Sequence, residues 1–112
     1  MKKLFLAALL SLSSCFGTDS VGSEVDCLVI KEENSIICKY MTQRSTEDKF
    51  RKVEWINPEG EISRTRNVLI PSGHGSVYDF RYLSGREVGV WNFRVTDKDQ
   101  VFNTTFEVLA EE

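Results

Sequence analysis

The stretch Gly89-Val90-Trp91-Asn92-Phe93-Arg94-Val95 decides the fold of this chain, because its apolar and polar residues alternate from Trp91 to Val95. Trp91, Phe93 and Val95 fall on one face of an extended strand, and the polar residues between them fall on the other. A period of two residues is typical of a strand that packs one face on a core and leaves the other in water. The stretch therefore predicts an antiparallel β-sheet covered on one side.

A second alternating run lies earlier in the chain. Tyr78, Phe80 and Tyr82 share one face of a predicted strand, and Asp79 and Arg81 share the other. Because the apolar face of such a strand packs on the core, we expect the three rings to be buried and the two charged residues to face water. Two further segments show the same alternation: Val53 with Trp55, and Phe102, Phe106 and Val108 with Asn103 and Glu107 opposite.

Seven runs of this kind follow residue 24, separated by polar or glycine-containing turns such as Asn57-Pro58-Glu59-Gly60. The predicted strands cover residues 25–31, 35–42, 50–56, 61–70, 76–83, 89–96 and 101–109. After the first fifteen residues no segment keeps a helical period in its apolar residues. We therefore predict an all-β fold, an antiparallel β-sandwich of about seven strands, with closure into a small barrel as the alternative.

Three motifs resemble those of bacterial immunoglobulin-like modules: Trp55-Ile56-Asn57-Pro58-Glu59-Gly60, Gly89-Val90-Trp91-Asn92-Phe93-Arg94-Val95 and Phe106-Glu107-Val108. In that family a tryptophan strand ends in a Pro-x-Gly turn, and a late Gly-x-Trp strand pairs with a final Phe-x-Val strand. The resemblance covers residues 25–109 and implies an immunoglobulin-like domain at residues 25–112. The chain departs from the antibody pattern because Cys27 and Cys38 lie on adjacent early strands, so we expect no disulfide between distant strands.

The N-terminal residues have the layout of a secretory signal. Lys2 and Lys3 precede an apolar run from Leu4 to Leu12, and small residues follow it. The run has about nine residues, whereas a helix that spans a bilayer needs about 20. A permanent membrane anchor is the alternative to a cleaved signal.

The motif Leu12-Ser13-Ser14-Cys15 resembles the lipobox of bacterial lipoproteins. That resemblance implies a signal peptide at residues 1–14, a diacylglyceryl group on the thiol of Cys15 and a fatty acid such as palmitate on its new amino terminus. In that family an aspartate directly after the cysteine implies retention in the inner membrane. Phe16 stands at that position here, so the resemblance implies the outer membrane of a bacterial cell envelope. Residues 15–24 are rich in glycine, serine and threonine, so we expect them to be a flexible tether.

If lipid occupies Cys15, two of the three cysteines remain for a disulfide in an oxidising compartment. A hairpin centred between Glu32 and Glu33 places Cys27 opposite Cys38, within reach of a disulfide. Two buried free thiols are the alternative. Cys27, Cys38 and the lone His74 are too few soft ligands for a zinc site, and we expect no metal and no cofactor.

The charge of the chain excludes one class of partner. Its formal net charge is −3, and loss of the two signal lysines makes it −5. Nucleic-acid binding requires a basic stripe, so we expect no nucleic-acid partner. Arg81 and Arg94, placed on outward faces of neighbouring strands, are either a basic strip for an anionic glycan or protein, or ordinary solvated charges.

The loop Ser72-Gly73-His74-Gly75 contains the only histidine and is the candidate binding loop. His74 as a base for a nearby serine would make the chain a small hydrolase, but the sequence places no carboxylate to orient the imidazole. We therefore expect no enzyme. The favoured function is a membrane-anchored envelope module that binds a protein or a glycan, with a structural subunit of an envelope complex as the alternative.

Overall fold

The computed structural model describes residues 22–110, so the predicted signal peptide, the lipobox with Cys15 and most of the predicted tether lie outside the described residues. Seven strands form, each bounded within one residue of its prediction. They are β1 (Glu24–Ile30), β2 (Ser35–Met41), β3 (Lys49–Ile56), β4 (Ile62–Ile70), β5 (Ser76–Tyr82), β6 (Gly89–Asp97) and β7 (Gln100–Val108). A short 3-10 turn, η2 (Lys31–Glu33), joins β1 to β2.

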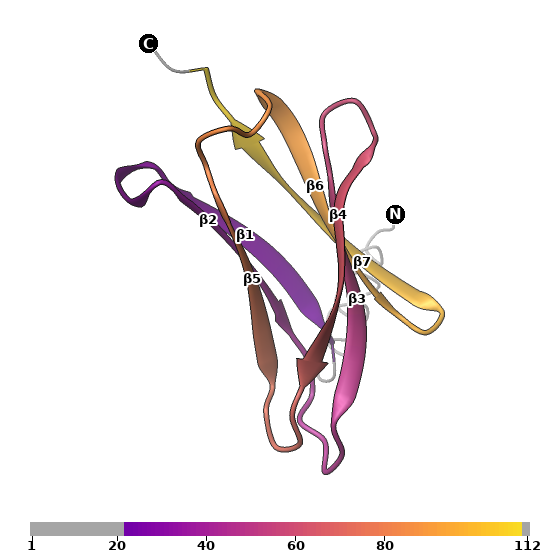
Figure 1. The fold of residues 1–112 in the computed structure, drawn as a ribbon. Helices are drawn as coiled ribbons and strands as arrows, with labels where there is room; N and C mark the ends of the chain where they lie inside the picture. The colour runs from indigo at the N-terminus through magenta and orange to yellow at the C-terminus, as the bar shows by residue number, and fades with distance from the viewer. Residues whose placement is uncertain (1–21, 111–112) are drawn as a thin grey trace, which may run out of the picture.

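The strands form two antiparallel sheets, in the orders β1-β2-β5 and β4-β3-β6-β7. Figure 1 shows the two layers facing each other. The predicted antiparallel β-sandwich of about seven strands is confirmed, and the barrel alternative is wrong because the two sheets do not join. Constant-type immunoglobulin domains place the fourth strand beside the fifth, whereas here β4 pairs with β3.

The core lies between the sheets and includes the alternating apolar residues that the sequence marked on β3, β6 and β7. Trp91 is 2% exposed and stacks on Phe106, with ring centroids 6.0 Å apart and an interplanar angle of 12°. Trp55 is fully buried and meets the ring of Phe93 edge to face at 5.3 Å. The buried apolar residues are Ile36, Cys38, Tyr40, Val53, Trp55, Val68, Ile70, Trp91, Phe93, Val95, Phe106 and Val108.

The strand β5 has the opposite orientation from the one predicted. Asp79 is 4% exposed and points into the sandwich, whereas Tyr78, Phe80 and Tyr82 are 57%, 43% and 62% exposed. The prediction that these three rings pack in the core is wrong. Alternation along a strand defines two faces, and one step of register decides which of them is buried.

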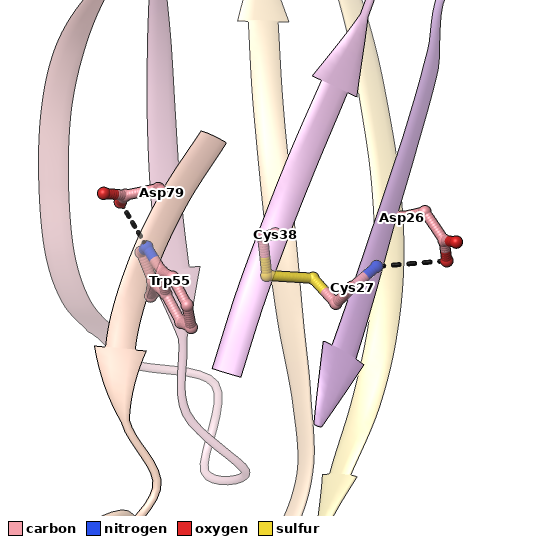
Figure 2. The surroundings of a disulfide bond; sticks show 5 residues. All are labelled: Asp26, Cys27, Cys38, Trp55 and Asp79. Carbon is pink, nitrogen blue, oxygen red and sulfur yellow. Dashed lines mark hydrogen bonds between the residues drawn. A yellow bond between two sulfur atoms is a disulfide. The ribbon is translucent and has the colours of Figure 1, made fainter. Parts of the chain in front are cut away.

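A hydrogen-bond requirement of the core explains this orientation. The indole Nε1 of Trp55 lies in the core and needs an acceptor there. It donates to Oδ2 of Asp79 at 2.7 Å, and Figure 2 shows the two side chains meeting between the sheets. Nη1 of Arg66, on β4, donates to Oδ1 of the same carboxylate at 2.6 Å. The buried charge of Asp79 is thus paired and hydrogen-bonded, which a buried carboxylate requires.

Arg81 also points inward, on the same face of β5 as Asp79. Its guanidinium carbon lies 5.3 Å from the ring centroid of Trp55 and 6.0 Å from that of Trp91, within the range of cation–π attraction. Burial, followed by the charges of Arg86 and Arg64, lowers the pKa of Arg81. Arg81 therefore closes the side of the sandwich where β5 and β4 run as edge strands.

The predicted basic strip of Arg81 and Arg94 does not form. The two arginines belong to different sheets. Arg94 lies on the outer face of β6, where its Nε donates to Oε1 of Glu54 at 2.9 Å. The prediction failed because it treated strands that follow each other in sequence as neighbours in one sheet, whereas the chain crosses to the other sheet between β5 and β6.

Replacing Asp79 with alanine should lower the free energy of unfolding by about 3 kcal/mol, because the substitution leaves a buried indole N–H and the Arg66 guanidinium without their acceptor. Urea denaturation of the two proteins measures the difference. Asp26→Ala is the matched control, since Asp26 is an exposed aspartate of the same sheet that also accepts from an N–H. Equal destabilisation by the two substitutions would contradict the proposed role of Asp79.

Candidate functional site

The disulfide predicted from the hairpin register is present. Cys27 on β1 lies directly opposite Cys38 on β2, with their Cα atoms 4.0 Å apart, and the two sulfur atoms are bonded. Figure 2 shows the bond between the two strands. Cys38 is fully buried and Cys27 packs against the core, so the bond fastens the edge strand β1 to β2 from the inside. Its role in this structure is to hold the sheet together.

The candidate loop Ser72-Gly73-His74-Gly75 is a tight connection between β4 and β5 with an exposed histidine. The backbone N–H of His74 donates to the carbonyl of Pro71 at 3.0 Å. The carboxylate of Asp48, which reaches this loop, accepts from the backbone N–H of Ser72 at 2.8 Å. Asp48 therefore braces the backbone of this loop.

The same loop lies at the end of the sandwich where the described chain begins. We call this the proximal end; it comprises residues 22–23 and the connections 42–48, 71–75 and 98–99. Ser23 is within 3.0 Å of the hydroxyl of Thr42, and Nη1 of Arg44 donates to the carbonyl of Gly73. The seven residue-to-residue steps from Cys15 to Gly22 span at most about 25 Å. An anchor on Cys15 would therefore keep this end near the membrane.

An exposed apolar surface lies on the outer face of the sheet β1-β2-β5, where the sequence pattern predicted buried rings. We call it the outer face and define it by Leu28 and Ile30 on β1, Ile37 on β2, and Tyr78, Phe80 and Tyr82 on β5. The register sets Leu28, Ile37 and Phe80 side by side across the three strands. Continuous apolar patches of a few hundred Å² on soluble proteins are often functional, so this face is the candidate site.

Polar residues border the outer face toward the proximal end. Asp26, Lys39 and Tyr78 lie in one row of the sheet, and Nζ of Lys39 lies 5.5 Å from the ring centroid of Tyr78. Toward the distal end the surface is apolar, and the rings of Phe80 and Tyr82 meet edge to face at 5.3 Å and 76°. An apolar centre with a polar border is the composition of a protein–protein contact surface.

A sequence signal for the outer face exists in retrospect. Asp79 stands between aromatic residues on a strand that pairs with the central strand of its sheet, and Trp55 brings an indole N–H into the core. A buried tryptophan requires an acceptor, and an aspartate in a strand can supply it. This requirement predicts that Asp79 points into the core and that the rings of Tyr78, Phe80 and Tyr82 face the solvent.

Over residues 22–110, no group of three or more histidine, cysteine, aspartate or glutamate side chains is arranged to hold a metal ion. Within the same range, no helix has the length and apolar character needed to cross a membrane.

Fold and surface together define an antiparallel β-sandwich whose smaller sheet carries an exposed aromatic face. No protein-family model and no curated protein matches the chain.

Proposed function

We propose that this chain is a non-enzymatic, lipid-anchored binding module of a bacterial cell envelope, and that its outer face binds another envelope protein. The anchor rests on the lipobox at Leu12-Ser13-Ser14-Cys15, with Phe16 favouring the outer membrane. The observation that carries the binding role is the exposure of Tyr78, Phe80 and Tyr82 beside Leu28. Tyrosine and phenylalanine are enriched where protein partners meet, because they bury large area at low entropic cost.

The geometry of the rings favours a protein over a glycan. A sugar ring stacks on an aromatic ring by laying one of its faces flat against it. Phe80 and Tyr82 are nearly perpendicular, so they offer no flat platform for consecutive sugar units. The ammonium of Lys39 already lies over the ring of Tyr78. Leu28 and Ile37, which lie beside Phe80, add aliphatic surface that suits apolar side chains of a protein.

The size of the outer face favours a reversible contact over a permanent subunit interface. Three strands about 4.8 Å apart and seven residues of about 3.3 Å each give a face of about 14 Å by 23 Å, or about 330 Å². A stable protein complex buries about 800 Å² on each partner. The face alone is therefore too small for an obligate complex, and it fits a narrow apolar segment of a partner bound transiently.

Photo-crosslinking in the native envelope tests the proposed face. A photoreactive phenylalanine analogue at position 80 should give a discrete adduct with an envelope protein. Leu69 is the matched control, because it lies on the outer face of the opposite sheet and is 42% exposed, against 43% for Phe80. Adducts of equal yield from positions 80 and 69, or from neither, would refute binding through the outer face.

The lipid anchor has its own test, the intact mass of the protein extracted from membranes. We expect a chain that begins at Cys15, carries the added mass of acyl groups and is two hydrogens short because of the disulfide. The Cys15→Ser variant should lose the acyl mass and leave the membrane fraction. An unmodified mass that begins at another residue would make the chain a secreted domain and remove the anchor from the proposal.

A further inference from the structure

A pocket of about 460 Å³ opens at the distal end of the sandwich, which comprises the turns at residues 31–34, 57–61 and 83–88. Figure 1 shows the β1–β2 hairpin diverging from β6 and β7 at this end. The walls are apolar and come from both sheets and the β5–β6 connection: Val29, Leu83, Val88, Val108 and Leu109. Pockets for small ligands have about 300–1,000 Å³ and walls of this composition.

Asn34 holds one wall of the pocket in place. This residue ends the η2 turn with φ at 54°, in the left-handed region that asparagine tolerates. Its carbonyl accepts from the backbone N–H of Leu83 at 3.0 Å, and its Oδ1 accepts from the backbone N–H of Ser84 at 2.7 Å. These bonds tie the β1–β2 hairpin to the β5–β6 connection, so the pocket is formed before any ligand arrives.

The charges at the mouth of the pocket are mainly positive. Lys31 and Arg86 line it together with one carboxylate, Glu107. The ion pairs found within residues 22–110 involve neither Lys31 nor Arg86. The Nε of Arg86 donates to the carbonyl of Tyr82 at 3.1 Å, which fixes the guanidinium at the rim. A mainly apolar lining that also includes two cations and one carboxylate is complementary to a molecule with an apolar body and an anionic head.

We propose that this distal pocket binds an amphipathic anion with a single apolar chain, such as a fatty-acid carboxylate. The apolar chain would replace water against Val29, Leu83 and Val88, and the carboxylate would lie between Lys31 and Arg86. The site is distinct from the outer face, whose residues point away from the core. It also lies at the opposite end of the sandwich from the chain's N-terminal connection, about 23 Å along β1 from Glu24.

Nuclear magnetic resonance titration with dodecanoate, below the concentration at which it forms micelles, tests the proposal. The chain from Phe16 onward is suitable, because it contains every strand and the whole core. Dodecanoate should shift backbone amide signals at residues 29–31, 83–88 and 107–110. Shifts centred on Phe80 and its neighbours, or no saturable shifts at all, would overturn the assignment of the pocket.

A matched pair of valines separates the pocket from general surface binding. Val88 and Val101 are each 56% exposed, but Val88 lines the pocket and Val101 lies at the proximal end of β7. Val88→Glu should weaken dodecanoate binding by about tenfold or more, because it puts a charge against the apolar chain. Val101→Glu should leave the affinity unchanged. Equal loss in both variants would overturn the proposal.

The head group is tested with a second ligand of the same chain length. Dodecyltrimethylammonium should bind about three- to tenfold more weakly than dodecanoate, as expected for one or two exposed ion pairs. Lys31→Glu should remove that preference and leave binding of neutral dodecanol unchanged. Equal affinity of the wild-type protein for dodecanoate, dodecyltrimethylammonium and dodecanol would overturn the proposal that the ligand is an anion. The pocket would then bind apolar chains without selecting for charge.

Discussion

The hydrogen bond from Trp55 to Asp79 fixes the orientation of β5, and the surfaces of the domain follow from it. A carboxylate this deeply buried is tolerated because Trp55 and Arg66 both donate to it. With Asp79 inside, the period of the strand turns Tyr78, Phe80 and Tyr82 to the solvent. The same row of the sheet contains Cys38 and Cys27, so the carboxylate and the disulfide lie side by side across the smaller sheet.

The proximal end, the outer face and the distal pocket lie on three different parts of the domain. The proximal end receives the chain from the predicted anchor and holds the loop of His74, so that loop would face the membrane. The outer face lies along the side of the smaller sheet, where an envelope protein could approach without meeting the lipid surface. The distal pocket opens at the opposite end, between the β1–β2 hairpin and the β5–β6 connection. A short tether and a rigid sandwich would keep the two proposed binding surfaces at set distances from the membrane.

Most of the fold could be predicted from the sequence, because alternation and turn residues are local signals. Alternation within each segment is enough to predict the seven strands and the burial of Trp91. The turn between Cys27 and Cys38 is enough to predict their register. The orientation of β5 depends instead on a contact between Trp55 and Asp79, which are 24 residues apart. The glycines and the lone histidine predict a binding loop at His74, whereas the exposed face arises from packing that no single strand encodes. The distal pocket needed the long-range bonds of Asn34 to Leu83 and Ser84, and a sequence pattern does not contain them.

The orientation of β5 is the central claim, and nitration of tyrosine in the folded protein measures it directly. The chain has three tyrosines, of which Tyr40 is 1% exposed while Tyr78 and Tyr82 are mostly open to solvent. Treatment with tetranitromethane followed by peptide mass analysis should find nitration at Tyr78 and Tyr82 and none at Tyr40 until the protein is unfolded. Protection of Tyr78 and Tyr82 to the same degree as Tyr40 would place the aromatic face of β5 in the core and contradict the account.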